Sequence, residues 1–160
     1  MDSFVLQPLG AVTLDVVLDV ASALHRACFG PMGERVWTRQ DIAGLLASPG
    51  VCGLLLQHDG RDIGFVLSRV VADEAEVLTI AIDPAHRRRG AGGRLLQAVI
   101  GNARAAGTRS LYLEVGVDNP VARALYAKAG FEEVGRRSNY YQRGPGKMVD
   151  ALIMRLKLAG

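Results

Sequence analysis

Three arginines lead directly into glycines at the start of an apolar segment, in the stretch HRRRGAGGRLLQAVI over residues 86–100. From Leu95 onward, apolar residues recur at helical spacing, which predicts a helix. Glycine costs a helix interior about 1 kcal/mol relative to alanine. Gly90, Gly92 and Gly93 therefore need a reason other than helix propensity to stand where this helix begins.

Anion binding at the helix start supplies such a reason. The first turn of a helix has N–H groups without intrahelical partners, and the helix dipole adds partial positive charge there. A phosphate binds such an end when it can approach the backbone, which glycine permits because it lacks Cβ. Arginines can add bidentate contacts to phosphate oxygens. Residues 87–93 therefore predict a pyrophosphate-binding turn.

Other interpretations of this turn fit the residues less well. A dinucleotide-binding fingerprint needs a third glycine where Leu95 stands, and a Walker loop needs Lys-Ser/Thr where Arg94 and Leu95 follow. A nucleic-acid patch would be supported by interleaved aromatic residues or a wider basic stripe, which the sequence around HRRR lacks. A solvated charged turn, with glycines present only for packing, remains the structural alternative.

Composition limits the class of protein. The 160 residues are 49% hydrophobic and 22% charged with a net charge of +3, which is typical of one soluble globular domain over residues 1–160. No apolar run approaches the ~20 residues that span a membrane, and the first ten residues lack the layout of a signal peptide. We therefore expect a cytoplasmic protein in which Cys28 and Cys52 are reduced, buried thiols.

The remaining patterns predict a mixed α/β chain in the order β-α-α-β-β-β-α-β-α-β-β, with one central sheet and helices on both faces. Thr38 and Asp41 form a capping box, and Trp37 with Ile42 a hydrophobic staple, so Trp37 is expected to be structural. Strands are expected over residues 3–9, 51–57, 62–71, 76–82, 110–115, 131–137 and 150–158, helices over 13–29, from 38, from the glycines to 107 and between 119 and 130, and a loop over 138–149.

One carboxylate stands out in the strand SLYLEV. Leu111, Leu113 and Val115 alternate on one face, so Tyr112 and Glu114 point to the other. A carboxylate in mid-strand among apolar residues is costly to bury without a use. Glu114 is therefore a candidate catalytic residue, and a glutamate that simply faces the surface is the alternative.

The segment IAIDPAHRRRGAGGRLL resembles the acetyl-CoA signature of the GNAT superfamily of N-acetyltransferases, whose Gln/Arg-x-x-Gly-x-Gly/Ala pattern is met by Arg87, Gly90 and Gly92. Within that superfamily, LYLEVGVDNPVARALYAKAGFEEVGRRSNYY and DALIMRL are similar to the RimI-type ribosomal-protein-alanine acetyltransferases. The similarity extends from about Val77 to Leu156. The first half of the chain agrees in element order and in the helix start WT.

The resemblance implies a GNAT fold in which the strands over 77–82 and 110–115 diverge around acetyl-CoA, the co-substrate, with no metal. Amides of the turn would hold the pyrophosphate, and the edge of the preceding strand would pair with the pantetheine arm. Asn119 matches an asparagine that contacts coenzyme A, and it can serve as a helix N-cap at the same time. The implied cofactor-binding residues are Ile80, Ala81, Ile82, Arg87, Arg88, Arg89, Gly90, Ala91, Gly92 and Asn119.

The resemblance also implies catalytic and substrate-binding residues. Glu114 coincides with the general base, and Tyr126 with the general acid, although Tyr126 can also be a packing tyrosine. Tyr140 and Tyr141 are expected to flank an acceptor peptide, the alternative being that they only cover the surface. Relatives commonly carry an arginine where this chain has Gly116, and their last loop differs in length and charge.

The expected function is acetyl transfer to a protein N-terminal α-amine, the N-terminal alanine of a small-subunit ribosomal protein. A peptide α-amine with a pKa near 7.8 is partly neutral at pH 7, whereas lysine, near 10.4, is far less so, which suits a single carboxylate base. A small-molecule amine or a lysine is the alternative acceptor. A non-catalytic nucleotide- or RNA-binding module is the alternative class. The expected partner is a protein or peptide N-terminus, with no membrane and no direct nucleic-acid contact.

Overall fold

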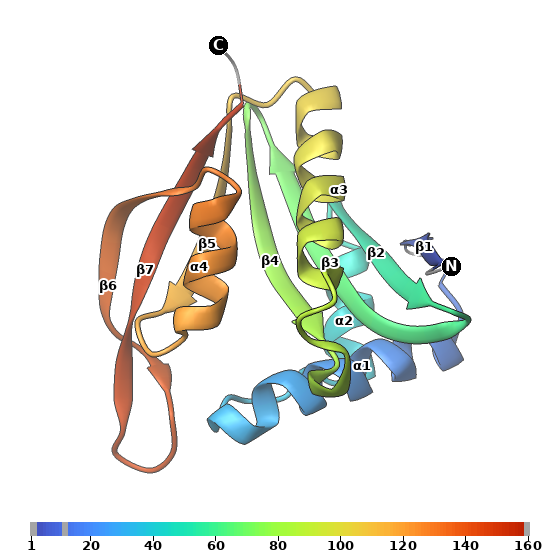
Figure 1. Cartoon of the computed structure of the whole chain (residues 1–160), viewed down its shortest axis with the longest axis horizontal. Helices are drawn as coiled ribbons and strands as arrows, with labels where there is room; N and C mark the ends of the chain where they lie inside the picture. Colours follow the sequence, from blue (N-terminus) through green and yellow to red (C-terminus); the bar gives the residue numbers. More distant parts are fainter. Residues whose placement is uncertain (1–2, 11–12, 159–160) are drawn as a thin grey trace.

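A mixed sheet in the strand order β1-β2-β3-β4-β5-β7-β6 carries the fold (Figure 1). The computed structural model describes residues 3–10 and 13–158, and the seven strands and four α-helices lie within them. The elements are β1 (Phe4–Leu9), α1 (Asp15–Phe29), the 3-10 turn η1 (Gly30–Met32), α2 (Arg39–Leu46), β2 (Val51–His58), β3 (Arg61–Val71), β4 (Glu74–Ile82), η2 (Pro84–His86), α3 (Ala91–Ala105), β5 (Ser110–Gly116), α4 (Pro120–Lys128), β6 (Glu132–Gln142) and β7 (Met148–Lys157).

The parallel pair β4–β5 is the place where the sheet opens. Its register runs only from Glu74 opposite Ser110 to Glu76 opposite Tyr112, whereas β4 stays paired with β3, and β5 with β7, to their ends. Figure 1 shows the two strands meeting at one end and separating towards α1. The predicted divergence of these strands is therefore confirmed.

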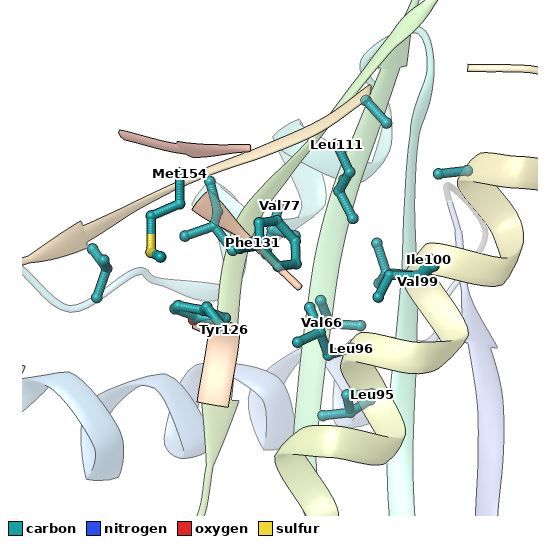
Figure 2. Packing of buried hydrophobic residues seen from close by; sticks show 14 of the residues in the cluster. Val66, Val77, Leu95, Leu96, Val99, Ile100, Leu111, Tyr126, Phe131 and Met154 are labelled. Atoms are coloured by element: carbon teal, nitrogen blue, oxygen red, sulfur yellow. The ribbon is translucent and has the colours of Figure 1, made fainter. Parts of the chain in front are cut away.

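Helices cover both faces of the sheet, as predicted, and each face has its own apolar core. On one face, α3 and α4 pack on the sheet, and Figure 2 shows the apolar side of α3 turned towards the strands. On the other face, α1 and α2 pack on Leu55, Phe65, Leu67 and Ala81. The α3 stripe consists of Ala91, Leu95, Leu96, Val99, Ile100 and Ala103.

Local signals place the two short helices. The Thr38 hydroxyl accepts from the Asp41 N–H at 3.1 Å, and the Asp41 carboxylate accepts from the Thr38 N–H at 2.8 Å, so the predicted capping box is present. Trp37 packs against the core cluster that contains Ile42, which confirms its structural role. α4 begins with Pro120 after the predicted N-cap.

None of the described helices is both long and apolar enough to cross a membrane.

The expected loop over residues 138–149 is wrong. β6 and β7 continue into this region, pairing Tyr141 with Val149 and Gln142 with Met148, so only residues 143–147 connect them. The register is irregular between Arg137 and Tyr141, and Asn139 has a φ of 50°. This irregularity interrupts the alternation from which a strand is recognised in a sequence.

His25 on α1 is a buried titratable group in the core beside α2. It is 2% exposed, accepts a hydrogen bond from the Trp37 N–H at 3.2 Å, and stacks on the Trp37 ring at 4.8 Å. Burial, followed by the charge of Arg35, lowers the pKa of His25 from 6.5 to about 4. The native protein therefore holds this side chain neutral.

We predict an acid-sensitive stability that is traceable to His25. Above pH 6.5 the group is neutral in both states. Between pH 6.5 and about 4 only the unfolded chain binds the proton, so the free energy of unfolding falls by up to about 1.4 kcal/mol per pH unit.

Urea unfolding from pH 7 to pH 4 measures this dependence. The variant His25→Gln keeps an acceptor for the Trp37 N–H but does not titrate, so its stability is expected to fall less steeply over that range. The same slope in both proteins would show that His25 does not carry the effect.

Candidate active site

A cleft of about 1880 Å³ opens where β4 and β5 separate. The start of α3 lines it together with α4, the end of α1 and the β6–β7 hairpin. Glu114, Tyr126, Asn119, Tyr140 and Tyr141 all contribute to its lining. The structure thus brings predicted residues from β5, β6 and α4 with its N-cap into one cavity.

The start of α3 has the geometry that an anion requires. Gly90 is the N-cap with a φ of 79°, a left-handed conformation that favours glycine. The first helical bond runs from the Arg94 N–H to the Gly90 carbonyl at 3.0 Å. The backbone N–H groups of residues 91–93 therefore have no intrahelical partner. A Cβ at Gly92 would lie 3.1 Å from Leu125 Cδ2, so this glycine also makes room where α3 meets α4.

The arginines before the helix supply unpaired positive charge. Arg87 and Arg88 line the cleft and are exposed, and no described residue forms an ion pair with either of them. The Arg87 guanidinium donates a hydrogen bond at 3.7 Å to the Cys28 thiol, which also lines the cleft. Arg89 is also exposed but does not line the cleft, so its side chain is not part of the arrangement that the sequence predicted.

The free edge of β4 faces the same cavity. The register between β3 and β4 shifts between Leu67 and Ser68, so Leu78 of β4 has no partner residue on β3. A bulge of this kind bends the strand that contains it. The side chains of Ile80 and Ile82 line the cleft. Ala81 points instead to the core beneath α1 and is fully buried. Ala81 can therefore contribute to the cleft only through its backbone.

Glu114 lies on the face of β5 that the alternation predicted, and its side chain is 26% exposed. The Arg137 Nε donates to Glu114 Oε1 at 2.6 Å. A hydrogen bond with Glu114, followed by burial, raises the pKa of the Tyr140 hydroxyl. The carboxylate is therefore held by Arg137 of β6, with the Tyr140 hydroxyl nearby, rather than isolated among apolar neighbours.

Tyr126 combines a packing role with a free hydroxyl. Its ring is 5% exposed, belongs to the core cluster and lies 5.9 Å from the ring of Phe131 (Figure 2). None of the described residues forms a hydrogen bond with its hydroxyl, while the side chain lines the cleft. Burial raises the pKa of this phenol well above its usual value. The proton is thus retained and available to a group in the cleft.

Asn119 and the two tyrosines line other parts of the cleft. Asn119 Oδ1 accepts from the Ala122 N–H at 3.1 Å, as the predicted N-cap, and the residue lines the cleft as well. Tyr140 and Tyr141 lie on β6 with their rings edge to face at 5.0 Å. Tyr140 is 49% exposed, whereas burial raises the pKa of the Tyr141 hydroxyl well above its usual value.

Several charged residues of the cleft were not found from the sequence, among them Glu34, Asp118, Arg137 and Arg143. Arg143 contacts Glu34, which lies 109 residues away in the chain, and Asp118, 25 residues away. No periodicity signals contacts of this kind. Two sequence features indicated a change here: the glycine at position 116, where relatives commonly have an arginine, and the different length and charge of the last loop.

Metal and thiol chemistry receive no support from side-chain clustering. Within residues 3–10 and 13–158, no three His, Cys, Asp or Glu side chains gather closely enough to hold a metal ion. Both cysteines are free thiols, as expected, but Cys28 is only half-buried and Cys52 is exposed. The expectation of buried thiols is wrong because Cys52 lies next to the start of β2, where the strand is still exposed, and Cys28 lies next to the end of α1.

Comparisons with known proteins agree with this geometry. The model of the acetyltransferase (GNAT) family matches residues 18–131. The "[Ribosomal protein bS18]-alanine N-acetyltransferase" of Salmonella typhimurium is 42% identical over 106 residues, which cover 66% of this chain and 71% of the relative.

Solved structures extend the similarity to almost the whole chain. The crystal structure of the ribosomal-protein-S18-alanine N-acetyltransferase from Escherichia coli has a TM-score of 0.85 and 28% identity, covering 99% of this chain and 96% of the other. A GNAT acetyltransferase from Elizabethkingia anophelis with acetyl-CoA bound has a TM-score of 0.76 and 19% identity, covering 97% and 98% of the two chains, and shows the shared fold.

Proposed function

Because the chain belongs to the acetyltransferase (GNAT) family, we propose that it transfers the acetyl group of acetyl-CoA to the α-amine of a protein N-terminus. The chain is an N-acetyltransferase, and its expected substrate is the N-terminal alanine of a small-subunit ribosomal protein. The name of the Salmonella relative gives alanine and ribosomal protein bS18 for that enzyme. Such a substrate is consistent with a cytoplasmic enzyme.

One observation carries the proposal: a single cleft contains an anion-binding helix start, a carboxylate and a phenol with a free hydroxyl. Acetyl-CoA has a pyrophosphate, an amide-bearing arm and a thioester, which match the amides of the turn, the open edge of β4 and Tyr126. Membership of the family favours this enzyme over the nucleotide- or RNA-binding module.

The proposed cofactor contacts follow from the geometry. Backbone amides over residues 87–92 hold the pyrophosphate, and Arg87 and Arg88 add charge from the exposed side. Arg89 contributes only its backbone. The pantetheine arm lies along the β4 edge over 80–82, where Ala81 also acts through its backbone alone. Asn119 retains its amide group for coenzyme A while its oxygen caps α4.

The proposed chemistry is direct transfer of the acetyl group. Glu114 takes a proton from the amine, directly or through a water, as the nitrogen bonds to the thioester carbon. Tyr126 gives its proton to the sulfur as the carbon–sulfur bond breaks. A phenol suits this step because it stays protonated at neutral pH and donates at short range. Tyr140 and Tyr141 flank the acceptor.

The choice of acceptor is the first prediction. Near pH 7, an alanine-started peptide is expected to be acetylated on the order of 10²-fold faster than an N-terminally blocked peptide with a lysine, because far more of the α-amine is neutral. Mass spectrometry of products from a panel of peptides and small amines makes the comparison. Faster acetylation of lysine or of a small amine would contradict the proposed function.

The second prediction separates Glu114 from Tyr126. Glu114→Gln keeps an acceptor for Arg137 but cannot take a proton, so its rate defect is expected to shrink as the pH rises and the acceptor deprotonates by itself. Tyr126→Phe is expected to lower kcat with little change in affinity for the cofactor. Each substitution is expected to lower the rate of acetyl transfer about 10²–10⁴-fold near neutral pH.

Rates against pH with an alanine-started peptide check this prediction. Glu133→Gln, at an exposed site on β6, is the matched control and is expected to match wild type. Profiles of the Glu114 and Tyr126 variants that coincide with wild type would mean that both residues are structural.

The third prediction concerns the turn at residues 87–93. Gly92→Val puts a branched side chain against Leu125 and Ile82, which line the cleft beside the turn. It is therefore expected to obstruct the approach of phosphate to the backbone and to weaken coenzyme A binding at least tenfold, about 1.4 kcal/mol. Gly101→Ala, on the same helix with no atom within 4 Å of the new Cβ, is the control and is expected to bind normally. Calorimetry that finds normal binding by folded Gly92→Val would refute this assignment of the turn.

A further inference from the structure

Arg143 lies at the tip of the β6–β7 hairpin, but its side chain is only 5% exposed. Its Nη1 donates to Glu34 Oε1 at 2.6 Å. Its Nε and Nη2 donate to the two oxygens of Asp118 at 2.9 and 3.2 Å. The guanidinium also lies 4.8 Å from the centre of the Tyr141 ring. This cation has two carboxylate partners and an aromatic face, so its charge is compensated.

Two glycines leave the space that this arrangement needs. A Cβ at Gly116 would lie 2.5 Å from Asp118 Oδ1 and 2.7 Å from Arg143 Nη2. A Cβ at Gly33 would lie 3.0 Å from the backbone carbonyl carbon of Arg143, and Gly33 has a φ of 79°. Any side chain at position 116 would therefore displace the guanidinium, and the hairpin tip packs directly on the backbone of the α1–α2 connection.

The hydrogen bonds of Arg143 with Glu34 and Asp118, called the bridge below, join three walls of the cleft. They lie on its acceptor side, the side lined by Glu114 and the two tyrosines of β6. Glu34 follows η1 in the α1–α2 connection, Asp118 lies between β5 and α4, and Arg143 belongs to the hairpin. All three residues line the cleft. Glu114 stands two residues before Gly116 on β5, and Tyr141 two residues before Arg143 on β6. The bridge therefore fixes the tyrosine pair of β6 relative to the carboxylate of β5.

We propose that Arg143 is a positioning residue for the acceptor, which sets the width of the acceptor side of the cleft by tying the hairpin to Glu34 and Asp118. This inference rests on the proposed function. The Arg143 side chain extends from the hairpin into the space beside Gly116. The cation next to β5 therefore comes from the hairpin and not from position 116. Lysine cannot replace it fully, because a single ammonium cannot form a fork with Asp118 and a third bond to Glu34.

Steady-state kinetics of Arg143→Met test the proposal. With an alanine-started peptide, KM for the peptide is expected to rise on the order of tenfold or more, because acceptor positioning is lost. KM for acetyl-CoA is expected to stay near the wild-type value, because among the described residues no hydrogen bond or ion pair joins Arg143, Glu34 or Asp118 to the turn at 87–93. Arg143→Lys is expected to be intermediate. Arg136→Met, which removes an exposed cation of β6 that is paired with Asp150 of β7, is expected to match wild type.

Two further variants keep the test decisive if Arg143→Met does not fold. Glu34→Gln weakens one arm and leaves the Asp118 fork in place, so a smaller rise in peptide KM is expected. A triple variant that adds Glu34→Gln and Asp118→Asn to Arg143→Met leaves no orphan charge, and it is expected to show the full rise.

Each outcome has one meaning. A peptide KM that is unchanged in these variants, or a parallel change in both KM values and kcat, overturns the positioning role and leaves the proposed function standing. A wild-type enzyme that acetylates no peptide α-amine overturns the proposed function and this inference with it.

Discussion

The loss of pairing between β4 and β5 after Glu76 is the constraint on which the rest of the structure depends. Backbone N–H and C=O groups need partners, and a strand edge that leaves the sheet presents them to whatever enters the gap. Here the gap is held open because β4 remains paired with β3 while β5 remains paired with β7. An amide-bearing ligand can complete the β4 edge in the manner of an added strand.

The gap also separates two electrostatic environments. At the start of α3, arginine side chains and backbone N–H groups can bind an anion. No carboxylate among the described residues forms an ion pair with Arg87 or Arg88. On the acceptor side, Arg137 and Arg143 are each already paired with carboxylates. The first environment favours binding of a polyanionic cofactor. In the second, the charged side chains form ion pairs that hold β6 and the hairpin in position. This division matches a reaction between a charged carrier and an amine.

Local chemistry made much of this predictable from the sequence. The capping box at Thr38, the glycine start of α3 and the alternation around Glu114 each depend on residues a few positions apart. Both strands of the last hairpin were predicted, but their continuation into residues 138–149 was missed because an irregular register at Asn139 interrupts the alternation. The bridge at Arg143 was missed because its partners come from distant segments, and only the folded sheet brings them together.

Hydrogen exchange with and without acetyl-CoA tests the central claim most directly, because it reports on the open edge residue by residue. The account predicts slower exchange for amides over 78–82 of β4 and 91–93 of α3 when acetyl-CoA is added, with the β1–β2 pair unchanged. Unchanged exchange at both places, in a protein that calorimetry shows to bind acetyl-CoA, would contradict it.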